Sequence, residues 1–404
     1  RHRSRSPEDD RYEMRRTSHF PIHGIHPRFV LLVFTEIFHL FKLNFIDSVK
    51  AAFIASYILS GLFMYLFVKD IAGRISGLMS AVLYLFTPYR FVDMYVRGSL
   101  GESVAFIFPP LILYAINKMF HARKVTRWCG FVSLGIAGLI TTHNVIAYLF
   151  LPVIICYFIY LAKQENHKTV IKYGILSILL GMGLSAFFWL PALVEKRYTI
   201  FDNVVISDFK TNFPLMIELI KPSWGFGPSR PGDPASMSFQ IGIVNILIVI
   251  SGLITIAIMN LSCFAGRVRG DKRNFTMIMF LLAVTLIAVF FMTEFSKPVW
   301  NIVPLLPLIQ FPWRILSVTT FSTAVLSGLL LTSLFNNRIY KSIVGLLVIG
   351  VILLLNNSYL RPSRYTNQPD GYYSTNEDTT TVQNEYLPIT AKNLPRIKAQ
   401  KKIE

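Results

Sequence analysis

Apolar segments of about twenty residues recur along almost the whole chain, and this repetition constrains the fold more than any other feature of the sequence. Hydrophobic residues make up 53% of the chain and charged residues 15%, whereas a soluble domain carries about a quarter charged residues. A helix of roughly twenty apolar residues is what crosses the hydrocarbon core of a bilayer. The sequence therefore predicts an all-α polytopic membrane protein with about ten transmembrane helices.

The predicted spans are separated by short polar links, and they lie at residues 50–68, 75–90, 102–120, 127–142, 144–162, 172–194, 239–261, 274–293, 314–335 and 340–357. The apolar run 128–161 is too long for one span, and its only polar break, Thr-Thr-His-Asn at 141–144, predicts a tight turn between two helices. Residues 29–43 are short for a span, and residues 303–313 carry three prolines. Both are expected to be interfacial or re-entrant segments on the outer face.

The chain divides into three parts by composition. Residues 1–28 are polar, Arg-rich and without period, and they begin at Arg1 rather than at a methionine. We expect this stretch to be irregular and to be truncated or non-native. Residues 29–357 form the predicted transmembrane domain, and residues 358–404 are expected to begin an extracytoplasmic soluble segment.

The charge distribution predicts which side of the membrane each link faces. The formal net charge is +18, but the basic residues lie in short links rather than on one surface, so no nucleic-acid partner is expected. One side collects Lys69, Arg74, Lys118, Arg123, Lys124, Arg127, Lys163, Lys168, Lys172, Arg267, Arg269, Lys272, Arg273, Arg338 and Lys341. Because short positive loops mark the cytoplasm, the link 90–102, the turn 141–144, the loops 195–238 and 294–313 and the tail are expected to face outward.

Several function classes find no support in the sequence. The apolar runs contain almost no acids, which argues against an ion or proton relay through the membrane. There is no Walker loop, no GxSxG, no HExxH and no CxxC pair. The polar groups collect instead at one face, which indicates a reaction or binding event at the outer membrane surface.

The link 89–102 holds two acids and two arginines between apolar spans. Asp93 and Glu102 are separated by two glycines and could converge across a turn, as a general base or as metal ligands. Arg90 and Arg97 would then hold a phosphate. The alternative is a solvated interfacial loop in which Asp93 pairs with Arg90 or Arg97, and spacing alone favours that alternative.

Other outer-face residues are candidates for the same site. His143 could act as a base or a phosphate donor, or could simply belong to a polar turn that caps two helices. Arg314 could hold a lipid phosphate or serve as an interfacial anchor beside Trp313. The further outer-face candidates are Glu195, Glu294 and Trp189.

The chain resembles a bacterial membrane family named for a "6-pyruvoyl-tetrahydropterin synthase related" domain, and that family is similar to GT-C type glycosyltransferases. The residues that carry the resemblance span roughly 45–390 and are Pro88, Tyr89, Arg90, Asp93, Tyr95, Val96, Arg97, Gly98, Glu102, His143, Asn144, Trp189, Leu190, Pro191, Ala192, Glu195, Phe311, Pro312, Trp313, Arg314, Glu385, Tyr386, Leu387 and Pro388. The family name implies no pterin chemistry here.

The resemblance implies a many-helix membrane fold in the bacterial cytoplasmic (inner) membrane, with its site at the outer face. Such enzymes transfer a sugar from a polyprenyl-phosphate donor, here in cell-surface polysaccharide or glycolipid assembly, and a divalent metal could take part. They hold an essential acid in a first outer loop, which would lie upstream of Phe29 and is expected to be missing from this chain. The alternative is a non-enzymatic export component or structural subunit, since no strong catalytic motif is present.

Overall fold

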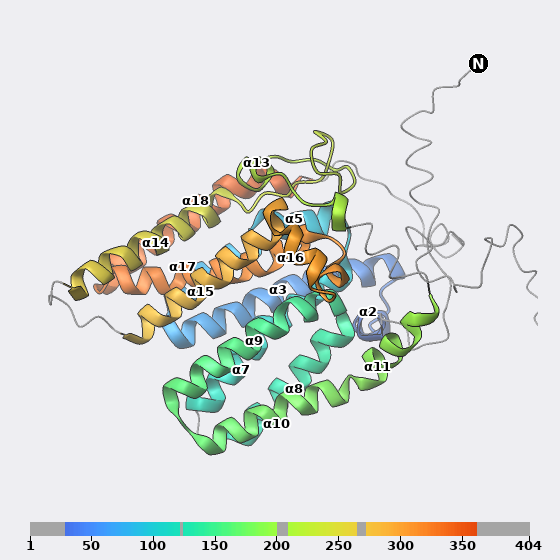
Figure 1. Cartoon of the computed structure of the whole chain (residues 1–404), viewed down its shortest axis with the longest axis horizontal. Coiled ribbons are helices and arrows are strands. Elements are labelled where there is room, and N and C mark those ends of the chain that lie inside the picture. The colour runs from blue at the N-terminus through green and yellow to red at the C-terminus, as the bar shows by residue number, and fades with distance from the viewer. Residues whose placement is uncertain (1–28, 122–123, 200–208, 265–271, 362–404) are drawn as a thin grey trace, which may run out of the picture.

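The computed structural model of the chain describes residues 29–121, 124–199, 209–264 and 272–361, and within these ranges the chain is helical with no β-sheet. Eight helices of the described part are long and apolar enough to cross a membrane, and two bent helix pairs raise that number to ten. Each of the ten predicted spans corresponds to one of these helices or pairs. The predicted class, an all-α polytopic membrane protein, is confirmed (Figure 1).

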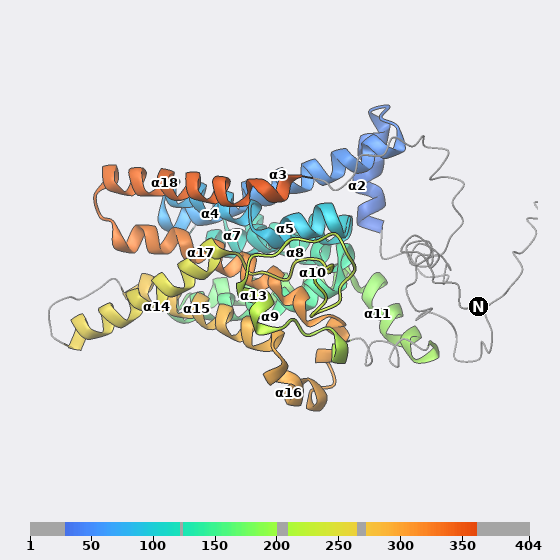
Figure 2. The ribbon, with the colours of Figure 1, turned by 90° about the horizontal axis from the view of Figure 1, so that it is seen from above.

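The helices run back and forth between two ends of the bundle. In chain order the first half contains α3 (Phe45–Ala72), α4 (Arg74–Leu85), α6 and α7 (Leu100–Ala105 and Phe108–His121), α8 (Val125–Thr142), α9 (Asn144–Glu165) and α10 (Lys168–Leu184). The second half contains α14 (Ile243–Phe264), α15 (Lys272–Met292), α17 (Leu316–Leu334) and α18 (Arg338–Asn356). Short helices, among them α2 (Phe29–Leu40) and α11 (Ala186–Glu195), lie at one end of the bundle (Figures 1 and 2).

Helix α17 lies at the centre of the bundle, and nearly all of its side chains are buried. It packs against α15, α4 and α14. Hydroxyl groups join it to these neighbours, because Thr332 lies 2.8 Å from Ser76 and Ser322 lies 2.7 Å from Thr285 (Oγ atoms in each pair). In a lipid environment such interhelical hydrogen bonds satisfy polar groups that water cannot reach.

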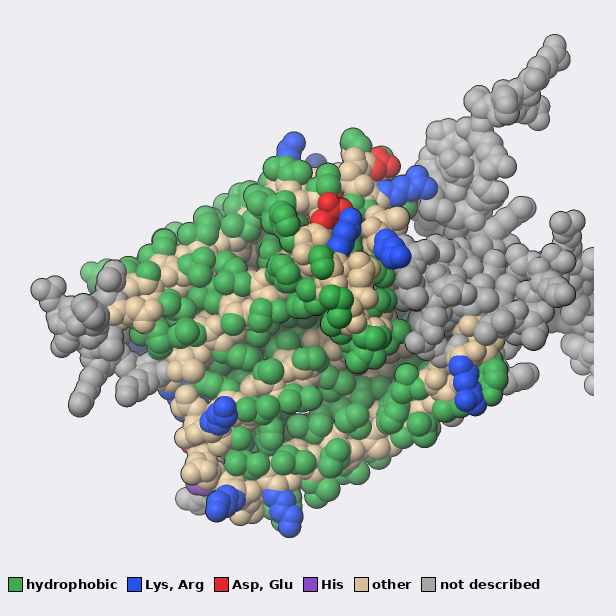
Figure 3. All heavy atoms as spheres, viewed as in Figure 1, with side chains coloured by type: hydrophobic (Ala, Val, Ile, Leu, Met, Phe, Trp, Pro, Cys, Tyr) green, Lys and Arg blue, Asp and Glu red, His purple; other side chains and the backbone are tan. Residues whose placement is uncertain are grey.

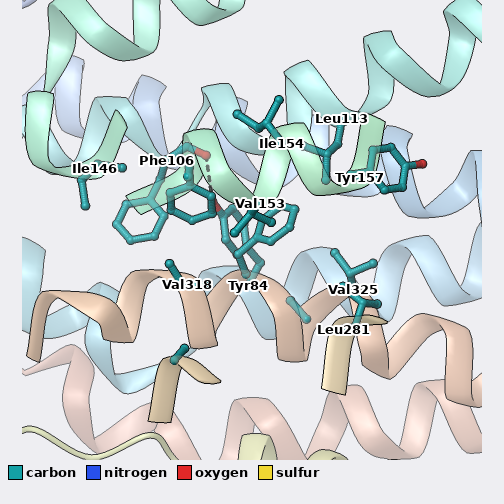
Figure 4. Close-up of a cluster of buried hydrophobic side chains, with 14 of the residues drawn as sticks. Tyr84, Phe106, Leu113, Ile146, Val153, Ile154, Tyr157, Leu281, Val318 and Val325 are labelled. Carbon is teal, nitrogen blue, oxygen red and sulfur yellow. Dashed lines mark hydrogen bonds between the residues drawn. The ribbon is translucent and has the colours of Figure 1, made fainter. Parts of the chain in front are cut away.

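The apolar core lies between α17 and the helices of the first half. Figure 4 shows Val318 and Val325 of α17 facing Tyr84, Ile154 and other buried side chains. The Tyr84 hydroxyl donates a hydrogen bond of 2.8 Å to the carbonyl oxygen of Phe106. This bond gives the buried Tyr84 hydroxyl an acceptor. It also gives a donor to the Phe106 carbonyl, which has no helical partner because the helix is interrupted between α6 and α7.

The outer surface is as apolar as a lipid-facing surface should be. Helix α10 exposes Leu176, Leu179 and Leu180 by half or more, and α18 exposes Leu347 and Leu354 even further. Figure 3 shows hydrophobic side chains over most of one face, with lysines and arginines toward its edges. A soluble monomer rarely exposes so continuous an apolar surface, so a bilayer is the solvent that fits it.

Two predicted spans are bent rather than straight. Predicted span 75–90 consists of α4 and then α5 (Pro88–Phe91) with a π-helical turn, at an angle of 48°, and predicted span 172–194 consists of α10 and α11 at 62°. Pro88 cannot donate the next backbone hydrogen bond, which explains the first break. At the second break, the carbonyl oxygen of Gly181 accepts both the backbone N–H of Ser185 (3.3 Å) and its hydroxyl (3.0 Å), and a serine that bonds back in this way often bends a helix.

The shorter predictions have mixed outcomes. The turn at 141–144 is present, since α8 ends at Thr142 and α9 begins at Asn144. Residues 303–313 contain no span-length helix and form short turns after α16 (Lys297–Ile302). Their interfacial placement, like that of α2, stays a prediction. The predictions for residues 1–28 and for the tail beyond residue 361 lie outside the described residues.

Candidate functional site

The link 89–102 folds into three short helical turns at the end of the bundle that carries α2 and α11. Helix α5 continues into a π-helical turn, η1 (Val92–Val96), and α6 then begins the next span. Gly98 separates the two with a φ of 58°, a conformation that glycine adopts without strain. π-Helical turns are rare in proteins overall, but where they occur they are frequently at functional sites.

Both acids of the link are completely buried, with no exposed surface on Asp93 or Glu102. Arg97 joins them: its Nη1 donates to Oδ1 of Asp93 at 2.7 Å and to Oε2 of Glu102 at 2.6 Å. The predicted convergence of Asp93 and Glu102 is therefore confirmed. The predicted alternative is confirmed as well, in part, because Asp93 does pair with Arg97, although inside the protein rather than in a solvated loop.

The remaining carboxylate oxygens also have donors. The Tyr89 hydroxyl donates to Oε1 of Glu102, and the Ser103 hydroxyl donates to Oδ2 of Asp93 at 3.2 Å. Tyr89 and Ser103 were not predicted as site residues. Tyr89 could have been, because a tyrosine at a helix break between spans needs a partner for its hydroxyl, whereas nothing in the sequence indicates Ser103.

Arg97 uses only one of its guanidinium nitrogens, Nη1, for its ion pairs with the acids. Both of its ion pairs leave from one nitrogen, and 15% of its side chain is exposed. Its guanidinium lies over the ring of Trp313, 4.7 Å from the centroid. Burial works against the charge of Arg97, but Glu102, Tyr89 and Asp93 outweigh burial and raise the pKa of Arg97 above its ordinary value. Arg97 is thus positively charged and forms ion pairs with two acids.

Arg314 comes from the turn η5 (Pro312–Ile315) and lies on the same indole. Its guanidinium is 5.8 Å from the Trp313 centroid and 4.8 Å from that of Phe311. Its Nη1 donates to the carbonyl oxygen of Ile309 at 3.3 Å and to Oε1 of Gln310 at 3.2 Å. No acid forms an ion pair with it among the described residues, and its Nε is without a hydrogen-bond partner there.

His143 lies in the break between α8 and α9, beside the charged groups. Its Nδ1 accepts a hydrogen bond of 3.3 Å from the backbone N–H of Ile146, so the proton of the neutral ring is on Nε2. Burial lowers the pKa of His143 to about 4, with Arg314 and Arg97 acting in the same direction and Glu102 against it. The capping alternative is confirmed, and the ring is also near enough to Glu102 and Arg314 for their charges to act on it.

Arg90 is sealed in the bundle. Only 2% of it is exposed, and its guanidinium lies 4.1 Å from the centroid of Phe106. Its position does not favour the predicted phosphate contact, because no open surface adjoins it. Arg97 and Arg314 are the two predicted phosphate ligands that the structure brings together. They come from distant parts of the chain and both lie beside Trp313.

The three other outer-face candidates are not part of this cluster. Glu294 pairs with Lys297 at 2.5 Å, the Trp189 indole N–H donates to the carbonyl oxygen of Met182 at 2.9 Å, and Glu195 ends α11. In the described ranges none of them forms a hydrogen bond or an ion pair with Asp93, Arg97 or Glu102.

A divalent metal does not fit the acids as they are arranged. All four carboxylate oxygens of Asp93 and Glu102 accept from protein donors. The part of the chain that the structure describes has no group of three or more His, Cys, Asp or Glu residues placed to hold a metal.

Comparison with known proteins gives one partial match. No protein-family model and no solved structure matches the chain. The chain is 32% identical over 164 residues to an uncharacterized protein of Lactococcus lactis subsp. cremoris (strain MG1363). The match covers 38% of this chain and 26% of that protein, so the chain spans about a quarter of the length of the relative it matches. The resemblance to the pterin-synthase-related membrane family and to GT-C glycosyltransferases stays a prediction.

Proposed function

We propose that the chain is an integral membrane glycosyltransferase-like protein of the bacterial cytoplasmic membrane. In this proposal it transfers a sugar from a polyprenyl-phosphate donor at the extracytoplasmic face, in cell-surface polysaccharide or glycolipid assembly. The observation that carries the proposal is the pair of guanidinium groups, Arg97 and Arg314, that share the ring of Trp313 at one end of the bundle.

The hydrogen-bonding capacity around Trp313 favours an anionic ligand. Arg314 Nε and the Trp313 indole N–H are buried donors without an acceptor among the described residues. Unpaired buried donors are costly, and an oxyanion would satisfy them. The charges of three arginines act on the two buried acids, those of Arg97 and Arg90 on Asp93 and those of Arg97 and Arg314 on Glu102, so the arginines outnumber the acids by one. A phosphate group supplies both the acceptor oxygens and the opposite charge.

The acids have two roles in this proposal. In the resting state Asp93 and Glu102 hold Arg97 in place. When Arg97 moves onto the donor phosphate, a released carboxylate can accept the proton of the acceptor hydroxyl. The acceptor oxygen then forms the new glycosidic bond, the bond between the sugar and the phosphate breaks, and the electron pair leaves with polyprenyl phosphate, whose charge Arg97 and Arg314 neutralise.

The test is a transfer assay in membranes that contain the protein, with radiolabelled polyprenyl-phosphate sugars as donors. We expect Asp93→Asn and Glu102→Gln to reduce transfer by about a hundredfold or more, as loss of an acid–base group does. Arg314→Gln should weaken donor binding. Glu294→Gln is the matched control, because that acid is exposed and pairs only with Lys297 in the described structure. Unchanged transfer in both acid variants would remove these roles.

One observation favours a non-enzymatic alternative, an export component or structural subunit. Both carboxylates are completely buried and fully hydrogen-bonded, as in a purely structural ion-pair cluster. Substrate flux through reconstituted vesicles without any sugar transfer would support that alternative.

A further inference from the structure

Gln310 adopts a backbone conformation that residues other than glycine rarely take. Its φ is 68° and its ψ is −52°. Across it, the backbone N–H of Phe311 donates to the carbonyl oxygen of Ile309 at 2.8 Å. These angles and this hydrogen bond define a γ-turn of the positive-φ form, which is rare and strained. Strained residues of this kind persist only where their surroundings fix them, and they cluster at ligand-binding sites.

Arg314 contacts the γ-turn on both sides of its strained peptide. Its Nη1 donates to the carbonyl oxygen of Ile309 at 3.3 Å and to the side chain of Gln310 at 3.2 Å. Because a guanidinium has donors only, the carboxamide atom that faces it must be the oxygen, Oε1. The ring of Phe311 lies under the same guanidinium, 4.8 Å away, and stacks on Trp313. The turn therefore sets the position of Arg314 beside the indole.

The two oxygens that bind Arg314 are neutral, whereas those that bind Arg97 are charged. Arg97 forms ion pairs with Asp93 and Glu102, and no acid of the described ranges forms one with Arg314. A carboxylate in place of the Gln310 carboxamide would add an ion pair at the same contact and would cancel the charge of Arg314. The glutamine leaves that charge available, together with the buried Nε of Arg314, which has no hydrogen-bond partner among the described residues.

We propose that Gln310 is a positioning residue of a phosphate site at Trp313. The γ-turn and the carboxamide fix Nη1 of Arg314, and because both anchors are neutral, the positive charge and Nε are left for the oxygens of a prenyl phosphate. Gln310 acts through Arg314 and needs no contact with the ligand. That the phosphate belongs to a prenyl lipid rests on the proposed function.

The experiment measures ligand binding and stability in the same variants of the full chain, in mixed detergent micelles. The probe is farnesyl phosphate, a short prenyl phosphate, and farnesol and inorganic phosphate are titrated alongside it by calorimetry. Gln310→Glu places a carboxylate against Arg314, so it should weaken the binding of farnesyl phosphate by about tenfold or more and leave that of farnesol unchanged. The same variant should be at least as stable as wild type, because an ion pair replaces a contact with a neutral oxygen.

Gln310→Gly is the second variant, and it tests the strained turn. Glycine adopts a positive φ without strain, and the substitution removes one of the two anchors of Arg314. We expect the binding of farnesyl phosphate to weaken by about threefold or more, while the unfolding equilibrium is unchanged or shifts toward the folded state. In both variants affinity then falls without a loss of stability, which a residue that only stabilises the fold would not produce.

Asn301→Asp is the matched control, because it adds the same charge at an exposed residue of α16 in the loop 294–313. It should leave the affinity for farnesyl phosphate unchanged. An affinity that falls only where stability falls, or that Gln310→Glu does not change, would overturn the inference. So would a wild-type protein that binds farnesyl phosphate no better than farnesol, and equal affinity for inorganic phosphate would overturn the assignment to a prenyl lipid.

The transfer assay separates this inference from the proposed function. Sugar transfer by the wild type, with an affinity for farnesyl phosphate that Gln310→Glu leaves unchanged, would contradict the inference alone. Binding of farnesyl phosphate that responds to Gln310→Glu as expected, in a protein that transfers no sugar, would support the inference and contradict the proposed function alone.

Discussion

Three arginines surround the candidate site, and their surroundings separate their roles. Arg97 is held by two acids and is part-exposed, Arg314 contacts a carbonyl, an amide and two rings, and Arg90 is enclosed by aromatic side chains. The sequence places all three at the ends of apolar runs and assigns them one role, phosphate binding. Burial and hydrogen-bond partners distinguish the two guanidinium groups beside Trp313 from the one that aromatic side chains enclose.

The depressed pKa of His143 predicts a particular dependence of stability on pH. Burial lowers the pKa of His143 from 6.5 to about 4 in the folded protein. Between those values the unfolded chain binds more protons at this residue than the folded chain does. The contribution of His143 to stability is therefore complete above its unfolded pKa, and it is lost as pH falls toward the folded pKa.

We expect the His143→Asn variant to lose less stability than wild type when the pH is lowered through that window. Asparagine keeps an acceptor for the helix cap and cannot take up the proton. The measurement is the unfolding midpoint in detergent micelles at several pH values. Parallel pH curves for the two proteins would show that His143 does not titrate in this way.

At the scale of the elements, hydropathy predicted the helices well and their bends poorly. All ten apolar runs form helices, because no other backbone arrangement of one segment satisfies its own hydrogen bonds in lipid. The breaks at Pro88 and Ser185 were placed inside continuous predicted spans. The break at Pro88 can be predicted from the sequence, because proline lacks a backbone N–H. The break at Ser185 cannot, because a serine whose hydroxyl donates to the Gly181 carbonyl looks in the sequence like any other small residue of an apolar run.

The geometry of the candidate site was predicted only where its residues are neighbours in sequence, although His143 and Arg314 were candidates for the same site as well. Asp93, Arg97 and Glu102 lie within one link, so their convergence follows from local geometry. Trp313 and Arg314 reach the same place from more than two hundred positions away, and spacing contains no information about that. Spacing alone favoured a solvated loop, and that part of the prediction was wrong, because both acids are buried and burial depends on how the later helices pack over the link.

The packing of α17 against its neighbours predicts an effect of Gly328→Ala. A Cβ atom at Gly328 would lie 2.5 Å from the Ser80 hydroxyl and 2.5 Å from Cγ1 of Val68, and 3.0 Å from the carbonyl oxygen of Ser76. Small residues let helices approach closely in a membrane, so we expect Gly328→Ala to destabilise the protein by about 1–3 kcal/mol. Unfolding in mixed micelles measures the change.

Gly350→Ala is the matched control for that variant. Gly350 lies inside α18, and nothing comes within 4 Å of a Cβ atom added there. The same substitution should therefore be neutral or stabilising, by up to about 1 kcal/mol from helix propensity. Equal effects at the two positions would mean that α17 is not packed as tightly as the structure has it.

At the scale of the whole molecule, charge separates the two ends of the bundle. Asp93, Arg97 and Glu102 lie at one end, beside the short helices. The opposite end carries the described basic residues of the predicted cytoplasmic links, together with the pairs Lys118–Asp70 and Arg273–Glu165. The helix directions place the predicted cytoplasmic links on one common end, which is what the charge pattern requires. The side of the membrane that each end faces stays a prediction.

Labelling from outside intact cells tests that prediction. In a variant in which Cys129, Cys156 and Cys263 are replaced by serine, we would place a single cysteine either at Phe295, 75% exposed at the site end, or at Lys168, exposed at the first turn of α10. Positively charged links are retained in the cytoplasm, so a membrane-impermeant maleimide should reach the first position and not the second. Permeabilised cells, in which both positions should react, control for the reactivity of each cysteine. The reverse pattern would put the arginine pair on the cytoplasmic side, where a donor presented at the outer face could not reach it, and the proposed function would fail with the topology.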